Sequence, residues 1–260
     1  QGNPEAAQKI LVKVLGVSAG ETVQKIQASL QREHKPSMAD LKSPKGGWYP
    51  IVWVGIGLAI FQQFVGINVI FYYSNVLWEA VGFTESSSFV ITVLTSVTNI
   101  VTTLIAIAAV DRAGRRPLLI IGSIGMTVSL AAMAFIFGTA PVVDGVPQLG
   151  GMGPVALAAA NIFVIAFGMS WGPVMWIMLG EMFPNMYRGA ALSVAGFAQW
   201  AANWVVTVTF PSLKDISLGL AYGLYAAFAL LSLLFVLRFV HETKGLALED
   251  MDDGFVPGGH

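Results

Sequence analysis

The sequence predicts an all-α membrane protein with six transmembrane helices, and three observations support this fold class. Apolar residues make up 55% of the 260 residues, whereas charged residues make up only 11%, a balance typical of chains that reside in lipid. Six stretches are long enough to cross about 30 Å of hydrocarbon, which takes about 20 helical residues. The charged residues lie almost entirely between these stretches or near the ends of the chain.

The segment before the first apolar stretch is polar and basic. Residues 1–47 hold seven of the 14 Lys and Arg residues, and their apolar residues recur at helical spacing between Ile10 and Leu30. We predict short amphipathic helices that form a cytoplasmic linker over 1–47. The chain begins at Gln1 and shows no signal peptide, so we expect it to be part of a longer protein.

Six apolar stretches follow, separated by charged, glycine-rich or proline-rich residues. The run Asp111 to Arg116 separates the second stretch from the third, and the segment Pro141 to Gly153 separates the third from the fourth. We predict a transmembrane bundle over 48–240, followed by a cytoplasmic tail over 241–260. The predicted spans are 49–77, 88–110, 117–139, 153–179, 190–210 and 217–240.

The cations outside the linker indicate how the bundle is oriented. All but one lie on the same side of the predicted spans as the linker, and Lys214 alone lies on the other side. Cytoplasmic loops of membrane proteins are enriched in Lys and Arg, and an even number of spans returns the chain to its starting side. We therefore expect a multi-pass protein of the cell (plasma) membrane with both termini in the cytoplasm.

Composition also excludes several classes of protein. The net charge of −1 gives no argument for a nucleic-acid partner, and the absence of cysteine excludes disulfides and thiol catalysis. The three histidines, His34, His241 and His260, lie outside the predicted spans, and no metal-ligand or nucleophile constellation accompanies them. We expect neither an enzyme nor a metal or cofactor site.

The first span carries three carboxamides, Gln62, Gln63 and Asn68, where a simple anchor would be apolar. A buried polar group without a partner costs about 2 to 7 kcal/mol, so these groups need partners. Hydrogen bonds between helices are one interpretation, and a water-filled cavity is the one we favour. On an ideal helix Gln63 and Asn68 point about 140° apart, so both face one cavity only if the helix unwinds, which Gly66 permits.

The chemistry of these side chains favours an uncharged ligand. A carboxamide offers donors and an acceptor, which match the hydroxyl groups of a sugar. An anionic substrate would call for Lys or Arg at this depth, and the first span contains neither. The carboxamides therefore predict a site for a neutral, polyhydroxylated ligand.

The fourth and fifth spans carry a second polar and aromatic group. Gly172 and Pro173 interrupt the fourth span, and proline removes a backbone donor. Trp176 and Trp200 could stack on the apolar face of a sugar ring, with Gln199 beside them; simple packing between helices is the alternative.

Acidic residues lie among the arginines at the cytoplasmic ends of the spans. Asp111 precedes Arg115, and Glu181 precedes Arg188. Salt bridges between the two loops are expected at about 0.2 to 1 kcal/mol each, which is small enough for contacts that must open and close. The segment from Glu242 to Gly245 could join them.

Together these segments resemble the sugar porter family of the major facilitator superfamily, over essentially the whole chain and with greater similarity to bacterial xylose and glucose transporters than to animal facilitators. The motifs that carry the resemblance are Gln62-Gln63-x-x-Gly66-x-Asn68 with Tyr72-Tyr73-Ser74, Asp111-Arg-x-Gly114-Arg115-Arg116, Gly172-Pro173-x-x-Trp176, Glu181-x-Phe-Pro184-x-x-x-Arg188-Gly189 and Glu242-Thr-Lys-Gly245.

The resemblance implies a C-terminal half, in which the six spans are transmembrane helices 7 to 12 and residues 1–47 link the two halves. It implies an extracellular gate at Tyr72 and Tyr73, and helix hinges at Gly66, Gly172 and Pro173. The sugar contacts that it implies are Gln62, Gln63, Asn68, Asn99, Trp176, Gln199 and Trp200. The cytoplasmic salt-bridge network that it implies consists of Asp111, Arg115, Glu181 and Arg188.

We therefore expect a transporter that moves a neutral monosaccharide, such as glucose or xylose, by alternating access. Its partners would be the sugar, the lipid bilayer and an N-terminal half of six helices. Proton-coupled symport is the leading expectation, and facilitated diffusion is the alternative. A sugar sensor that does not transport, and a half that serves only in assembly, are further alternatives from other classes.

Overall fold

The computed structural model of the chain describes residues 13, 37–44, 46–74, 78–79, 83–143 and 146–245. Apart from residue 13, the helices expected within 1–36 lie outside the described residues, as does the tail after residue 245. A short helix, η2 (Met38–Leu41), precedes the first span. The expectations for the linker and the tail thus stay predictions.

Six helical units in the described part of the chain are long and apolar enough to cross a membrane, which confirms the predicted fold class. Two of these units are interrupted, and each contains two α-helices. The units are Pro50–Tyr72, Glu85–Ala113, Arg115–Thr139, Gly150–Met182, Arg188–Ile216 and Leu218–Phe239. Their helices are α3 (Pro50–Phe64) with α4 (Ile67–Tyr72), α6 (Glu85–Ala113), α7 (Arg115–Thr139), α8 (Gly153–Gly168) with α9 (Pro173–Met182), α10 (Arg188–Ile216) and α11 (Leu218–Phe239).

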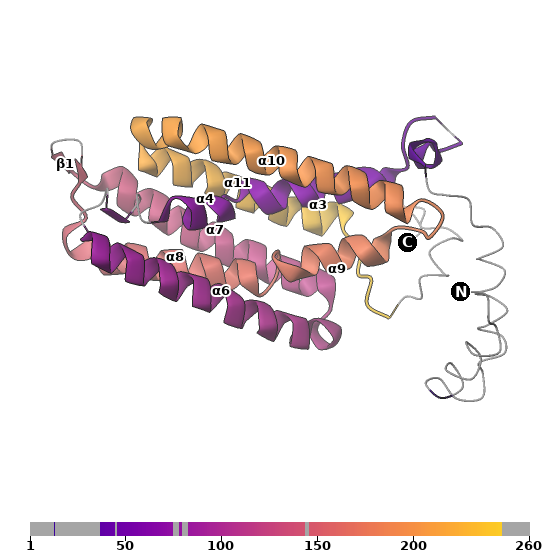
Figure 1. The fold of residues 1–260 in the computed structure, drawn as a ribbon, viewed down its shortest axis with the longest axis horizontal. Helices are drawn as coiled ribbons and strands as arrows, with labels where there is room; N and C mark the ends of the chain where they lie inside the picture. Colours follow the sequence, from indigo (N-terminus) through magenta and orange to yellow (C-terminus); the bar gives the residue numbers. More distant parts are fainter. Residues whose placement is uncertain are drawn as a thin grey trace.

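The connections place the two ends of the described chain on one side of the bundle. A hairpin of β1 (Val142–Val143) and β2 (Val146–Pro147), followed by η3 (Gly150–Met152), joins α7 to α8 at one end. The short helix η2 and the end of α11 lie at the opposite end of the bundle (Figure 1). The last turns of α6 and α9, which carry Asp111 and Glu181, also lie at this second end (Figure 1).

The helices pack around a core that runs the length of the bundle. Helix α7 lies between α8 and α11, α3 packs against α10, and α6 packs against α8. The contact between α7 and α11 is close because two glycines meet there. A side chain on Gly219 would place its Cβ 2.5 Å from the Cα of Gly138, so the two backbones approach as small residues allow in membrane helices.

Helix α10 extends beyond residue 210, where the sequence suggested an end. Pro211 lies inside the helix and cannot donate the hydrogen bond that the Thr207 carbonyl would otherwise accept. The hydroxyl group of Tyr73 donates to that carbonyl at 3.1 Å. Tyr73, directly after α4, thus replaces the donor that Pro211 lacks, and α10 continues for another turn and a half.

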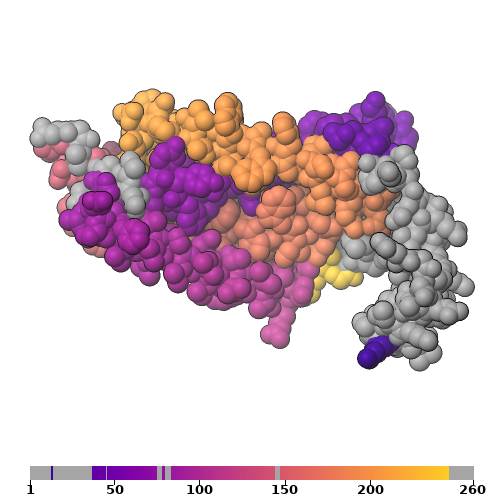
Figure 2. Space-filling model, viewed as in Figure 1, coloured from indigo at the N-terminus to yellow at the C-terminus, as the bar shows by residue number. Residues whose placement is uncertain are grey.

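Helices α6 and α10 present wide apolar faces to the outside of the described structure. Only 22% of an apolar 18-residue stretch of α6 is buried, and Phe197 and Trp204 of α10 are 76% and 66% exposed. These two helices border the face shown in the space-filling view, with α9 between them near the end that carries η2 (Figure 2). Such faces suit lipid or another helical body.

Candidate functional site

The first span breaks at a glycine that the local geometry requires. Gly66 has φ 82° and ψ 21°, in the left-handed region, and its N–H donates to the Gln63 carbonyl at 2.9 Å. A Cβ atom at this position would lie 2.7 Å from the ring of Tyr225. Glycine is therefore needed both for the backbone conformation and for the close approach of α11.

The break turns the side chains on its two sides toward each other. The Nδ2 atom of Asn68, after the break, donates to Oε1 of Gln63, before it, at 2.7 Å. An unbroken helix would point these two side chains in different directions. The backbone at Gly66 thus brings together two carboxamides that lie five residues apart.

Five carboxamides from α3, α4 and α10 form one hydrogen-bonded series, which we call the carboxamide chain: Asn203, Asn68, Gln63, Gln62 and Gln199. Nδ2 of Asn68 also donates to Oδ1 of Asn203 at 2.7 Å. Nε2 of Gln63 donates to Oε1 of Gln62 at 3.0 Å, and Nε2 of Gln199 donates to the same oxygen at 3.2 Å. The chain lies within the first and fifth spans, away from the loops.

The carboxamide chain is buried but not fully satisfied. Gln62, Gln63 and Gln199 are 4%, 4% and 7% exposed. Oε1 of Gln199 is buried without a hydrogen-bond partner among the described residues, and Asn68 is only partly buried. A buried acceptor without a partner is costly, so a ligand hydroxyl or a water that donates to it would be favourable.

The second interrupted span contributes a backbone acceptor to this chain. Helix α8 ends at Gly168 and α9 begins at Pro173, and the carbonyl of Trp171 between them accepts from Nε2 of Gln62 at 3.4 Å. The indole N–H of Trp171 donates to Oγ of Ser123 on α7 at 2.9 Å, and the side chain is fully buried. Hydrogen bonds thereby join the break between α8 and α9 to both α3 and α7.

The remaining expected sugar contacts lie outside the carboxamide chain. Trp176 and Trp200 are 42% and 65% exposed, so their rings have free faces in the described structure. Asn99 makes no hydrogen bond to the chain among the described residues. Its Oδ1 atom is buried without a partner and would lie 3.1 Å from a Cβ at Gly168. The structure therefore joins four of the seven expected residues and leaves these three separate.

The two tyrosines expected at the extracellular gate differ in their surroundings. Tyr72 is 57% exposed, whereas Tyr73 donates its hydroxyl proton to the Thr207 carbonyl and packs against Phe210 with ring centroids 5.0 Å apart. Tyr73 thus holds α4 against α10, and Tyr72 remains open to other contacts.

At the end of the bundle that carries η2, an arginine joins α6, α7 and α9. Arg115 donates from Nη2 to Oε1 of Glu181 at 2.6 Å and from Nε to Oε2 at 3.0 Å, a bidentate geometry that makes such pairs strong. Asp111 also pairs with Arg115, at 2.9 Å, and the Thr243 hydroxyl donates to Glu181 at 2.6 Å. Arg188 has a different partner: its Nε donates to the Phe183 carbonyl at 3.1 Å.

Glu242, from a distant part of the chain, caps the N-terminus of α7. Its carboxylate accepts hydrogen bonds from the backbone N–H groups of Arg115 at 2.9 Å and Arg116 at 3.0 Å, groups left unpaired at a helix N-terminus. It also accepts from the N–H groups of Thr243 and Lys244. Partial burial, the largest influence, raises the pKa of this carboxyl, but the four backbone hydrogen bonds together lower the pKa below its ordinary value.

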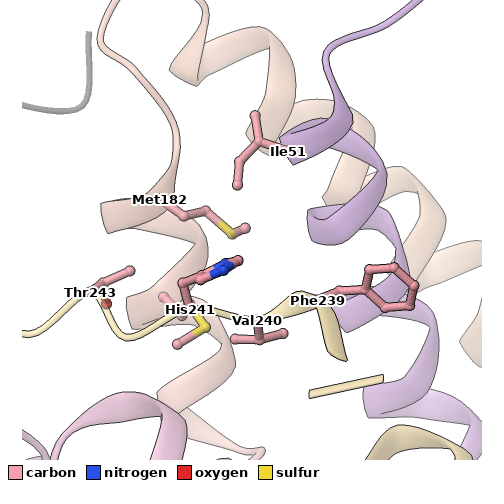
Figure 3. Close-up of a pocket in the computed structure, with 7 residues that line it drawn as sticks. Ile51, Met182, Phe239, Val240, His241 and Thr243 are labelled. Atoms are coloured by element: carbon pink, nitrogen blue, oxygen red, sulfur yellow. The ribbon is translucent and has the colours of Figure 1, made fainter. Parts of the chain in front are cut away.

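A pocket at the same end of the bundle is mostly apolar. His241 lies in the middle of the view, with Met182 and Val240 beside it and Phe239 farther away (Figure 3). The other residues that line it are Ile51, Met178 and Thr243. With few polar groups, this pocket matches a sugar less well than the carboxamide chain does.

Two residues of the assembled site were not among those expected from the sequence. Asn203 is one helical turn after Gln199, so their spacing on a single helix face could have indicated a shared role. Trp171 acts through its backbone carbonyl and through Ser123, which is 48 residues away. No sequence signal identifies that contact.

Comparisons with known proteins agree with this architecture. A family model described as "Sugar (and other) transporter" matches residues 1–255. The chain is 55% identical over 253 residues to the glucose transport protein of Synechocystis sp., covering 96% of this chain and 54% of that protein. It is 38% identical over 261 residues to the D-xylose-proton symporter of Escherichia coli, covering 97% of this chain and 50% of that protein.

A third relative differs in its name. The chain is 36% identical over 261 residues to the glucose facilitated diffusion protein of Zymomonas mobilis, covering 97% of this chain and 52% of that protein. The chain thus spans about half the length of the curated relatives that it matches.

Solved structures of the xylose transporter XylE have the same fold. A double tryptophan mutant of XylE matches with a TM-score of 0.81 and 37% identity, over 97% of this chain and 52% of that chain. XylE bound to 6-bromo-6-deoxy-D-glucose matches with a TM-score of 0.78 and 37% identity, over 96% of this chain and 52% of that chain. The inward open conformation of XylE from Escherichia coli matches with a TM-score of 0.68 and 37% identity, over 95% and 49%. From the family model, these relatives and the shared fold, the chain belongs to the sugar transporter family of the major facilitator superfamily.

Proposed function

We propose that this chain is the C-terminal half of a membrane transporter that carries a neutral monosaccharide by alternating access, coupled to protons. The observation that supports this most directly is the carboxamide chain. It places uncharged donors and acceptors within two spans, beside two helix breaks, as transporter sites are commonly built.

The proposed substrate is an aldose such as D-glucose or D-xylose. The carboxamide chain contains no charged group, so it suits hydroxyl groups better than carboxylates or phosphates. The relatives named for glucose and for xylose support the same class of substrate. Trp176 and Trp200, with their exposed rings, are proposed to stack on the sugar once the N-terminal half covers them, and Asn99 is proposed as a further polar contact.

The proposed transport cycle uses movable contacts at the two ends of the bundle. Tyr72 and Tyr73 on and beside α4 are proposed to close the extracellular side, with α4 turning about Gly66. Asp111, Arg115, Glu181 and Arg188 are proposed to open on the cytoplasmic side. The Arg115 to Glu181 pair is formed here, and the structure resembles the inward open form of XylE less than it resembles the sugar-bound form; both support a conformation closed on the cytoplasmic side.

We propose the plasma membrane as the location, with both termini in the cytoplasm. The distribution of cations supports this orientation, and the cytoplasmic side would be the end of the bundle that carries η2 and the end of α11 (Figure 1).

Facilitated diffusion is the second candidate, since relatives carry the names of both a proton symporter and a facilitated diffusion protein. The test is uptake of radiolabelled D-glucose and D-xylose by the full-length protein in proteoliposomes, with and without an imposed pH gradient. Symport predicts that an acidic exterior drives the sugar above its external concentration. Equal accumulation with and without the gradient would contradict symport, and absence of any uptake with sugar binding intact would favour a sensor.

A further inference from the structure

Asn203 of α10 is the end of the carboxamide chain, and all of its side-chain hydrogen bonds among the described residues use one atom. Its Oδ1 accepts from Nδ2 of Asn68 at 2.7 Å and from the Thr207 hydroxyl at 3.4 Å. The residue is 8% exposed. It therefore acts as a buried acceptor in the chain.

The acceptor on Asn203 determines what Asn68 can offer to a ligand. A carboxamide nitrogen carries two N–H groups, and both groups of Asn68 are used, one by Oε1 of Gln63 and one by Oδ1 of Asn203, each at 2.7 Å. The oxygen and nitrogen of a carboxamide are assigned from their partners, and two acceptors on one side place the nitrogen there. The Oδ1 atom of Asn68 accepts no hydrogen bond from the described residues, and Asn68 is partly exposed.

We infer that Asn203 is a positioning residue, which holds the Asn68 carboxamide so that it presents its carbonyl oxygen, and not its N–H groups, to the substrate. The inference rests on the proposed sugar site. It adds a rule of specificity: the site requires a hydrogen-bond donor on the sugar at the position that Asn68 contacts. A hydroxyl group satisfies this rule, whereas a fluorine atom, which only accepts, does not.

The test compares two kinds of glucose analogue on the purified full-length protein. D-Glucose, its monodeoxy derivatives and its monodeoxyfluoro derivatives are measured by isothermal titration calorimetry. A double-mutant cycle identifies the hydroxyl group that Asn68 contacts. Removing that hydroxyl from the sugar and changing Asn68→Ala should have non-additive effects on Kd, whereas the removal of any other hydroxyl should be additive with Asn68→Ala. At that position the wild-type protein should bind the fluoro sugar no better than the deoxy sugar.

Asn203→Leu should reverse this order. The change removes the acceptor, so the Asn68 carboxamide is no longer held in one orientation and can rotate to present an N–H group, which can donate to fluorine. We expect Kd for D-glucose to rise by about three- to tenfold, the loss of one oriented hydrogen bond, and the fluoro sugar to bind better than the deoxy sugar. Asn203→Ala provides the same deletion if the leucine variant does not reach the membrane.

Two further variants separate positioning from general damage. Asn203→Asp keeps an oxygen that accepts from Asn68 and should keep the wild-type order of the analogues. Asn161→Leu removes another partly buried carboxamide, which donates to the Leu157 carbonyl of its own helix at 3.0 Å, and should also leave the order unchanged.

The outcomes distinguish the inference from the proposed function. If the wild-type protein binds neither D-glucose nor D-xylose, the proposed function fails, and the inference fails with it. If the wild-type protein binds glucose but Asn203→Leu keeps the wild-type order, the role of Asn203 is overturned while the sugar site stands. A reversed order in Asn203→Asp would also overturn the role.

Discussion

The glycine at the break of the first span gives a prediction with a magnitude that follows from its geometry. Gly66→Ala places a methyl group in a left-handed conformation, which costs about 1 to 2 kcal/mol for a residue other than glycine. The same methyl group would lie 2.7 to 3.0 Å from three ring carbons of Tyr225, a buried side chain, and such overpacking costs about 1 to 3 kcal/mol. We expect a total destabilisation of about 2 to 5 kcal/mol.

The assay is thermal unfolding of the purified full-length protein in detergent, followed by intrinsic tryptophan fluorescence. Gly66→Ala should lower the midpoint by several degrees. Gly66→Asn tolerates the left-handed backbone better but retains the steric clash. The double variant Gly66→Ala/Tyr225→Ala removes that clash. Its thermal midpoint should therefore fall by less than the sum of the decreases in the two single variants.

The second break supplies a matched control. Gly172 has φ −58° and ψ −75°, and a Cβ there would meet Phe167 at 3.4 Å, an ordinary contact. Gly172→Ala should therefore change the midpoint much less than Gly66→Ala. Equal midpoints for the two alanine variants would refute the reasoning about backbone and packing at Gly66.

Two further predictions concern the Glu242 cap on α7 and the contact between α7 and α11. Because the pKa of Glu242 is lowered in the folded protein, its stabilisation is complete above its ordinary pKa of 4.5 and disappears as pH falls through the lowered value. The gap in thermal midpoint between wild type and Glu242→Gln should be wide at pH 7 and close at acidic pH; a constant gap would contradict this. Gly219→Ala, with a Cβ 2.5 Å from Gly138, should destabilise the protein strongly in the same assay, whereas Gly223→Ala, with its nearest contact at 3.9 Å, should not. Similar losses in both would argue against a close approach of the two helices.

The sequence was sufficient for the six spans because apolar length and charge segregation act locally. It was insufficient where a distant residue completes the backbone hydrogen bonding. The fifth span was expected to end at residue 210, but the hydroxyl of Tyr73 satisfies the Thr207 carbonyl that Pro211 leaves without a donor, and α10 continues to Ile216. A donor that lies 134 residues away in sequence has no local signal.

The candidate site shows the same division. The carboxamides around Gly66 were evident from the sequence, because polar residues in an apolar span need partners. Which partners they have depends on helix packing: Asn68 contacts Asn203 of α10, and Gln62 contacts the Trp171 carbonyl. Both contacts join spans that are distant in sequence, so spacing along the chain could not identify them.

The salt bridges around Arg115 illustrate a further limit of sequence-based prediction. Asp111 at the end of α6 pairs with Arg115 at the start of α7 across Gly114, and the short separation in sequence makes this pair easy to anticipate. The bidentate pair with Glu181 and the donation of the Arg188 guanidinium to the Phe183 carbonyl depend on where α7 and α10 begin relative to the end of α9. Arg188 stays a predicted member of the network, with a different partner in the described conformation.

The measurement that tests the central claim most directly is equilibrium binding of D-glucose and D-xylose to the full-length protein and to two site variants. Gln63→Ala and Asn68→Ala each remove a member of the carboxamide chain, and each should raise Kd by at least about tenfold, because partners are also left unpaired. Asn161→Ala, outside the chain, should bind as the wild type does. Wild-type affinity in both Gln63→Ala and Asn68→Ala would contradict the assignment of the sugar site to the carboxamide chain.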